Sequence, residues 1–201
     1  GFIDVLIDEV HGVPFFSPLY VKERKFALIC EKAGKLWDIV LPFPLNYFGR
    51  LTEKIYPIFY KNLKIITISN SSRDELSTMF SKKNIKIVHP GSSSSILNTI
   101  PQKDSILNLV FIARLSKTKG LEDALVAVSI IKNKKMKVVL HVIGRGEESY
   151  VRRIKEKIQA LSLQKNVVLY GYVSESEKNK IIDKSHILIC PSQKEGWGLT
   201  V

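Results

Sequence analysis

The chain has 201 residues, of which 45% are hydrophobic and 25% charged, and both shares are ordinary for a soluble globular protein. The net charge of +12 at pH 7 predicts attraction to an anionic partner such as a nucleotide, a phospholipid surface or a nucleic acid. Nucleic acid is disfavoured, because the sequence has no arginine-rich arm and no basic helix with interleaved aromatic residues.

The cysteines and the hydropathy pattern narrow the class of protein further. Cys30 and Cys190 lie far apart and lack metal-ligand spacing, so we interpret them as buried free thiols in a reducing cytosol. Apolar runs stay shorter than the roughly 18 residues that a membrane-spanning helix needs, so no such helix is expected.

Short apolar runs, each typical of a strand, recur along the whole chain. In chain order they cover residues 3–7, 26–30, 65–68, 85–88, 106–113, 138–143, 167–170 and 187–190. Between the later runs, apolar side chains at helical spacing predict helices over 121–131 and 151–161, and Ser174 to Glu177 forms a capping box that opens a third. Fully apolar strands that alternate with helices predict a doubly wound α/β fold with parallel sheets.

Two segments of the first half contain signals of helix or of surface contact. Ser71 with Asp74 is typical of another helix start. The segment 43–59 is strongly apolar, with Arg50 and Lys54 interspersed. It is either a helix packed on the first sheet or a surface that contacts an acceptor or a membrane.

A serine-rich stretch separates the two halves of the chain. Four consecutive serines follow Pro90 and Gly91, and such a composition favours a loop over any regular element. We therefore place the inter-domain linker there, which divides the chain into domains of residues 1–95 and 96–201.

Three loops in the second half follow predicted strands, so they lie at the carboxyl edge of the sheet, where open α/β sheets bind ligands. The first carries Arg114 and Lys119 and leads into a helix. A planar guanidinium and a mobile ammonium can converge on one diphosphate, helped by the helix N-terminus. The alternative is a pair of solvated loop cations.

The second and third loops are rich in glycine. Gly144 and Gly146 allow close approach of the backbone to a ligand, or form a plain strand–helix turn. Ser149 stands where a dinucleotide fingerprint has its third glycine, which disfavours a nicotinamide dehydrogenase. The third loop, 191–200, either exposes backbone amides to phosphate or sugar oxygens, with Glu195 accepting from sugar hydroxyls, or merely caps a helix.

These motifs occur in a fixed order along the chain. They are Ala113-Arg114-Leu115 with Lys119-Gly120, then Gly144-Arg145-Gly146, then Tyr170-Gly171-Tyr172-Val173, then Pro191-Ser192 with Glu195-Gly196-Trp197-Gly198-Leu199-Thr200. Together they resemble the group 1 (family 4) retaining glycosyltransferases of GT-B fold. Upstream, 8–20, 66–72 and 88–91 resemble the acceptor-side domain and the domain junction of the same family. The resemblance implies two Rossmann-like, doubly wound parallel-sheet domains, both incomplete in this chain.

The resemblance also implies roles for individual residues. Arg114 and Lys119 would hold and neutralise the diphosphate of a nucleotide-diphosphate sugar while Glu195 faces the sugar, and these three are the expected catalytic residues. The expected donor-binding residues are Gly144, Gly146, Tyr172, Val173, Glu175, Lys178, Gly196, Gly198, Leu199 and Thr200. No metal or other cofactor is expected, since cations and helix dipoles would replace it.

The implied acceptor is a sugar or a lipid-linked sugar, with no nucleic-acid partner. The implied location is the cytoplasm or the inner membrane face, where the basic protein would contact anionic lipid. Many relatives carry a histidine near the donor sugar at the position of Cys30-Glu31. His11, at a neighbouring strand end, is therefore a candidate on the acceptor side, or else an ordinary loop histidine.

Two parts of the family pattern would fall outside the chain. The second glutamate of the family's pair would lie beyond Val201, and the N-terminal glycine-rich loop before Gly1. The resemblance thus implies a chain cut short at both ends that does not turn over by itself. The alternative function is a non-catalytic nucleotide-sugar-binding or membrane-docking protein that kept the fold, for which Cys30-Glu31 is the sequence hint.

Overall fold

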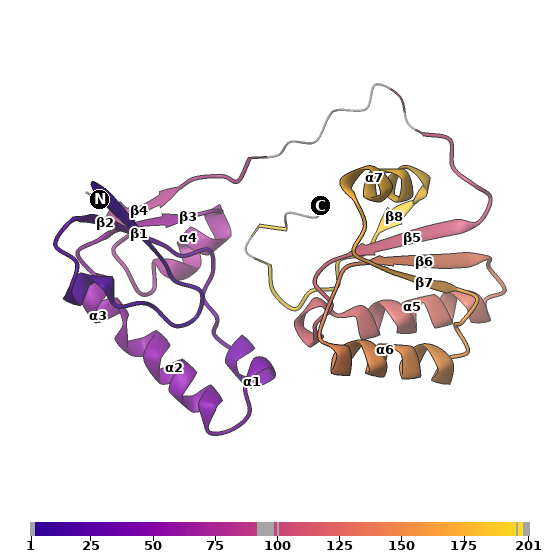
Figure 1. Cartoon of the computed structure of the whole chain (residues 1–201), viewed down its shortest axis with the longest axis horizontal. Coiled ribbons are helices and arrows are strands. Elements are labelled where there is room, and N and C mark those ends of the chain that lie inside the picture. The colour runs from indigo at the N-terminus through magenta and orange to yellow at the C-terminus, as the bar shows by residue number, and fades with distance from the viewer. Residues whose placement is uncertain (1–2, 92–98, 100, 196, 199–201) are drawn as a thin grey trace. The chain divides into compact units, whose positions relative to one another are not determined.

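The computed structural model of the chain describes residues 3–91, 99, 101–195 and 197–198. The chain divides into two compact units, 1–93 with 195–199 and 94–194 with 200–201, and each contains a four-stranded sheet (Figure 1). The boundary predicted at Ser95 lies outside the described residues. The division differs from the predicted domains in assigning 195–199 to the first unit.

The sheet of the first unit is parallel and has its strands in sequence order. The strands are β1 (Val5–Glu9), β2 (Arg24–Leu28), β3 (Lys64–Thr67) and β4 (Ile85–Ile87). Each lies within about two residues of a predicted apolar run. The register aligns Asp8, Ala27, Ile65 and Ile85, so these four side chains share the buried face of the sheet.

The connections of this unit are mostly short helices. They are η1 (Ser17–Leu19), α1 (Leu36–Val40), α2 (Leu45–Ile55), α3 (Pro57–Tyr60), α4 (Asn70–Leu76) and η2 (Lys82–Asn84). The core joins the sheet to α3, α4 and the loops around them through Val10, Ala27, Ile29, Tyr56, Tyr60, Ile65, Leu76, Phe80 and Ile85. On the opposite face of the sheet, Val5 and Ile7 are 45% and 57% exposed.

Helix α2 lies elsewhere than on the sheet. It packs against α1 and α3, and its apolar side chains Phe48, Leu51 and Ile55 are exposed. The interpretation of 43–59 as a helix packed on the first sheet is therefore wrong for α2, although Tyr56, just beyond it, lies in the core with Ala27 and Ile65. The reason is that small and polar side chains of α2, not apolar ones, make its contacts.

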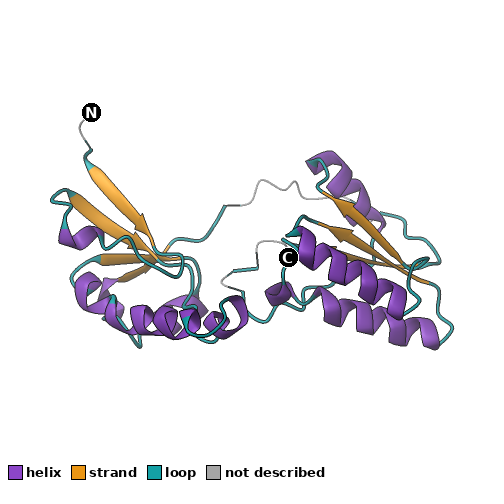
Figure 2. Ribbon diagram, turned by 60° about the horizontal axis from the view of Figure 1, so that its bottom comes forward, coloured by secondary structure: helices purple, strands orange, loops and turns teal. Residues whose placement is uncertain are grey.

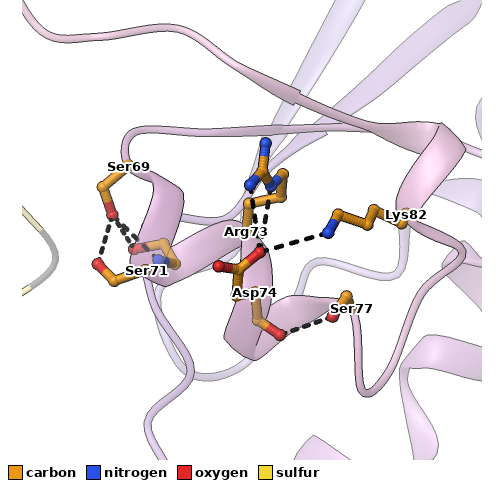
Figure 3. A network of polar contacts seen from close by, with 7 residues as sticks. Ser69, Ser71, Arg73, Asp74, Ser77 and Lys82 are labelled. Atoms are coloured by element: carbon orange, nitrogen blue, oxygen red, sulfur yellow. Dashed lines mark hydrogen bonds and ion pairs between the residues drawn. The ribbon is translucent and has the colours of Figure 1, made fainter.

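Helix α4 shows how a cap fixes a helix start (Figure 3). The cap is Ser69, whose hydroxyl accepts from the backbone N–H of Ser72 at 3.0 Å, so the helix begins at Asn70, just before the predicted Ser71. Asp74 contributes differently from the prediction, because its carboxylate pairs with Arg73 and with Lys82, at 3.3 and 3.7 Å.

The second unit has the predicted doubly wound parallel-sheet fold. Its strands β5 (Leu107–Ile112), β6 (Val138–Ile143), β7 (Val167–Gly171) and β8 (Ile187–Leu188) lie in the order β7-β6-β5-β8 and are all parallel. Helices α5 (Leu121–Asn133) and α6 (Glu148–Ala160) cover one face, and α7 (Glu175–Lys184) lies on the other (Figures 1 and 2).

Successive side chains along each strand point to opposite faces of this sheet. Leu109 and Phe111 of β5 and Leu140 of β6 point into the core with α5 and α6. Asn108 and His141 occupy the other face, where the His141 ring lies 3.2 Å from the Asn108 amide oxygen. The predicted capping box of α7 is confirmed, since the Ser174 hydroxyl and the Glu177 carboxylate each accept from the other's backbone N–H.

Two predictions from composition can be compared with the structure. None of the helices in the described part of the chain combines the length and the apolarity needed to span a membrane. Cys30 is half-buried, but Cys190 is exposed because β8 ends at Leu188, before the cysteine is reached. The prediction of a buried thiol at Cys190 is therefore wrong.

Candidate functional site

The strand order of the second sheet reverses between β5 and β8, which makes their carboxyl ends a topological switch point. In open α/β sheets, ligands bind outside the carboxyl ends of the strands at such a point. The loops that leave β5 and β8 lie against each other here, since Gln193 donates its backbone N–H to the carbonyl of Thr118 at 3.0 Å. A Cβ on Gly120 would come within 2.3 Å of the Pro191 carbonyl oxygen, so only glycine permits this approach.

Both predicted diphosphate ligands lie on the loop after β5. Arg114 is exposed two residues beyond the strand, and Lys119 is half-buried at the end of η3 (Lys117–Lys119), just before α5. The first turn of α5 carries the acid Glu122, whose carboxylate accepts from the Tyr150 hydroxyl on α6. This carboxylate is thus engaged with α6, and the loop before the helix carries Arg114, Lys117 and Lys119 and no acidic residue.

Gly144 and Gly146 have a structural reason to be glycine. A Cβ on Gly144, where φ is 143°, would lie 1.8 Å from the Ala113 carbonyl oxygen. A Cβ on Gly146 would lie 2.1 Å from the carbonyl oxygen of Leu115. The two glycines therefore let the loops after β5 and β6 pack backbone to backbone, and this packing accounts for them without a ligand. Their role in donor binding stays a prediction.

The loop after β7 completes this edge. Tyr172 is 71% exposed, and the guanidinium of Arg145 lies over its ring at 5.0 Å. Val173 is half-buried, and Lys178 pairs with Glu175 at 2.6 Å in the first turn of α7.

Arg145, which stands between Gly144 and Gly146, is a candidate that was not among the predicted site residues. Its guanidinium adds a further cation to the edge that holds Arg114 and Lys119, and it lies over the exposed ring of Tyr172. No local signal in the sequence could have found this contact, because Arg145 and Tyr172 lie on different loops that the pairing of β6 and β7 brings together.

The loop after β8 is described only in part. Glu195 is exposed and belongs, by its contacts, with the first unit, as does Gly198, where φ is 79°. Gly196, Leu199 and Thr200 lie outside the described residues. The roles predicted for these five positions stay predictions.

The first unit places its candidates at the carboxyl ends of β1 and β2. His11 is exposed after β1, and Cys30 follows β2. Burial, followed by the charges of Glu9 and Glu31, raises the pKa of the Cys30 thiol. Cys30 therefore stays a neutral thiol near pH 7 and supplies no thiolate nucleophile. Within the described ranges, the Glu31 Oε2 atom is shielded from solvent without a hydrogen-bond partner, so it is an acceptor available to a ligand hydroxyl.

A basic cleft that sequence analysis did not predict opens elsewhere in the first unit. It has a volume of about 640 Å³ and is lined by Lys32, Lys35, Arg50 and Lys54 around the carboxylate of Glu53. The cleft lies beside α2, not at the edge of the second sheet. All of its lining residues belong to the first unit, and none of them is a predicted donor-binding residue.

Sequence comparisons identify relatives of the second half of the chain. The model of the family described as "Glycosyl transferases group 1" matches residues 98–201. The poly(glycerol-phosphate) alpha-glucosyltransferase of Bacillus subtilis (strain 168) is 31% identical over 106 residues, which are 53% of this chain and 15% of that protein. The alpha-monoglucosyldiacylglycerol synthase of Streptococcus pneumoniae (strain ATCC BAA-255 / R6) is 31% identical over 98 residues, covering 49% and 22%. The matches thus span less than a quarter of each curated relative.

Solved structures resemble most of the chain. The crystal structure of TarM has a TM-score of 0.70 at 20% identity, over 98% of this chain and 38% of that one. The lipopolysaccharide outer core galactosyltransferase WaaB has a TM-score of 0.58 at 14% identity, over 98% and 75%. An Anabaena protein in complex with UDP and glucose has a TM-score of 0.65 at 14% identity, over 88% and 49%. These likenesses confirm the predicted GT-B fold.

Proposed function

Because the chain belongs to the group 1 glycosyl transferases, we propose that the protein transfers a sugar from a nucleotide-diphosphate sugar to an acceptor hydroxyl, with retention at the anomeric carbon. The observation that carries the proposal is the position of Arg114 and Lys119 on one loop at the switch point of the second sheet. Two cations at the place where this kind of sheet binds ligands suit a diphosphate.

The proposed chemistry is electrostatic support of a leaving group. The bond between the anomeric carbon and the diphosphate oxygen breaks, and its electron pair leaves with the nucleotide diphosphate. The acceptor oxygen bonds to the same face of that carbon and releases its proton to the departing phosphate or to water. Arg114 and Lys119 stabilise the charge that develops on the diphosphate, and the N-terminus of α5 adds a dipole of the right sign. In this scheme these groups do the work that a metal ion would otherwise do.

We assign the remaining donor contacts to the loops at the same carboxyl edge of the second sheet. The backbone at Tyr172 and Val173 would meet the base, with Glu175 and Lys178 beside it, and Glu195 would face the sugar. Gly198 would contribute a backbone amide, together with Gly196, Leu199 and Thr200 outside the described residues. A protein of the same fold binds UDP and glucose in its crystal, which makes UDP the first nucleotide to test.

The acceptor is proposed by chemistry. One relative is named for a poly(glycerol-phosphate) substrate and another for a diacylglycerol product, so a saccharide, glycerol-phosphate or lipid-linked hydroxyl is the class to test. His11 and the unpaired Glu31 oxygen lie at strand ends of the first unit and would serve this side. An enzyme with such acceptors would work in the cytoplasm at the inner membrane face.

Calorimetric titration of the protein with UDP, GDP and ADP tests the donor site. We expect one nucleotide to bind, and Arg114→Ala combined with Lys119→Ala to weaken it by roughly a hundredfold or more, because each charge-assisted hydrogen bond contributes about 1.5–3 kcal/mol. Lys134→Ala with Lys137→Ala removes two exposed cations of the same unit and is the matched control. Equal binding by all three proteins would remove the basis for the donor site.

Turnover is a separate test. Incubation of the bound nucleotide's sugar derivative with candidate acceptors should release the nucleotide diphosphate and form a product with the anomeric configuration of the donor, as read by NMR. Binding without any release of nucleotide, with any acceptor or water, would favour the non-catalytic alternative that kept the fold.

A further inference from the structure

Glu122 is an acid beside the loop that is proposed to bind an anion. It is the second residue of α5, three positions after Lys119. An acid in the first turn of a helix ordinarily stabilises the helix, because it lies near the positive end of the helix dipole. The same positive end is one of the groups proposed to attract the donor diphosphate. Glu122 and the diphosphate therefore compete for the same positive charge.

Both oxygens of the Glu122 carboxylate have a contact on α6. The Tyr150 hydroxyl donates to Oε2 at 2.5 Å, and a guanidinium nitrogen of Arg153 lies 3.9 Å from Oε1. The Arg153 side chain is 63% exposed, so water screens its ion pair with Glu122. The hydrogen bond from Tyr150 is therefore the main contact that directs the carboxylate toward α6.

Tyr150 is itself fixed by the core of the second unit. Its side chain is buried in the same cluster as Leu125 of α5 and Ile154 of α6. Burial, followed by the hydrogen bond to Glu122, raises the pKa of Tyr150, so the hydroxyl keeps its proton near pH 7 and remains a donor. A buried hydroxyl that lost its partner would reduce stability. The ring thus offers a fixed anchor to which the carboxylate is bound.

The first turn of α5 carries a second acid, Asp123, which allows a comparison. Asp123 is exposed, and solvent screens its charge. The single hydroxyl hydrogen of Tyr150 is donated to Glu122, so this contact does not hold Asp123. The two acids of one turn therefore differ in whether α6 restrains them.

We propose that Tyr150 is a positioning residue of the donor site, which holds the Glu122 carboxylate on α6 so that the positive charge of the loop after β5 stays available to the diphosphate. This inference rests on the proposed function, because it requires the diphosphate to bind at that loop. Without the Tyr150 hydroxyl, rotation of the Glu122 side chain would allow an ion pair with Lys119, and that pair would oppose an incoming anion. Tyr150 acts through Glu122 and touches no substrate.

A structural tether between α5 and α6 would account for the same hydrogen bond. Loss of a tether would lower the melting temperature, whatever the charge of residue 122. The composition of the loop favours positioning, because residues 113–120 carry three cations and no acid, and Glu122 is the first acid that follows them. The two explanations predict different responses to Glu122→Gln.

A double-mutant cycle tests the proposal by calorimetric titration of the full chain with UDP, GDP and ADP. Tyr150→Phe keeps the ring in the core and removes the hydroxyl. It should weaken binding of the nucleotide roughly fivefold, as expected from one competing surface ion pair, and the loss should shrink at high salt. Glu122→Gln keeps the shape of the side chain and removes its charge. We expect Tyr150→Phe with Glu122→Gln to bind as tightly as Glu122→Gln alone.

Two variants serve as matched controls. Asp123→Asn removes the other acid of the turn, and its effect on affinity should be the same in the parent protein and in Tyr150→Phe. Tyr170→Phe removes a hydroxyl that lies 2.9 Å from His141 on the opposite face of the sheet, and it should leave the affinity unchanged. Circular dichroism at the titration temperature confirms that each variant is folded.

The outcomes separate this inference from the proposed function. Equal affinity of the parent protein and Tyr150→Phe would overturn the positioning role and leave the donor site in place. A loss in Tyr150→Phe that Glu122→Gln fails to restore would overturn it in favour of a structural tether. A parent protein that binds none of the three nucleotides would remove the donor site, and the positioning role with it.

Discussion

Gly144→Ala is the substitution whose cost the structure defines best. The new methyl group would lie 1.8 Å from the Ala113 carbonyl oxygen and 2.9 Å from its carbon, and both belong to backbone that follows β5. At φ 143° the alanine is also strained. Backbone strain of about 1–3 kcal/mol and overpacking of about 1–3 kcal/mol add to roughly 2–6 kcal/mol. For a unit of about a hundred residues, this lowers the melting temperature by roughly 10 °C or more.

The control for Gly144→Ala lies on the neighbouring loop. Gly171 has φ 70°, but a Cβ there would meet no atom of the described residues within 4 Å, so Gly171→Ala should cost only about 1 kcal/mol of strain. Calorimetric unfolding of the two variants separates sterics from strain, and nucleotide titration then shows whether the β5 loop has moved. If both variants unfold at the same temperature, the close approach of the β5 and β6 loops has been misjudged, and Gly144 has no packing role.

Three further perturbations test the cores and the α2 contact. Tyr60 donates to the buried Asp8 carboxylate at 2.5 Å, so Tyr60→Phe should cost about 1–3 kcal/mol in urea unfolding. Burial, followed by the hydrogen bond to Asp8, raises the pKa of Tyr60 above 10.0. The free energy of unfolding should therefore fall as the pH rises above about 10, and Tyr60→Phe should remove this fall. The same dependence on pH in Tyr60→Phe and in the parent protein would contradict the assignment. Burial lowers the pKa of His141 below 6.5, so the unfolded chain binds that proton more tightly; stability should fall as the pH drops below 6.5, and His141→Gln should flatten the fall seen in thermal scans. Gly49→Ala would press a methyl group against the Trp37 ring at 2.4 Å and should cost about 1–3 kcal/mol, whereas a neutral result would mean that α2 is not held as described.

The carboxyl edge of the second sheet shows which features of the candidate site could be predicted from sequence motifs. Arg114 and Lys119 could be assigned to one loop because they follow a strongly apolar strand, and strand ends of a parallel sheet share an edge. That Arg145 lies over Tyr172 could not be predicted, because the two loops are adjacent only once β6 and β7 pair in register. Gly144 and Gly146 were recognised as special, but their contact with the β5 loop depends on the same pairing.

Local features of the chain were enough to predict the strands, the parallel α/β class and the family, because apolar runs, caps and ordered motifs can each be recognised within a short segment. The face of α2 that is buried could not be predicted in this way, because it depends on contacts with residues far away in the sequence. By composition the helix should bury Phe48 and Leu51, and it instead buries Gly49 and Glu53. The reason is that the Glu53 carboxylate accepts hydrogen bonds from the backbone N–H groups of Ala33 and Gly34. In addition, only glycine at position 49 leaves room for the Trp37 ring. Both contacts join α2 to residues that are distant in sequence. Hydrogen bonds between residues that are distant in sequence leave no periodic pattern from which they could be predicted.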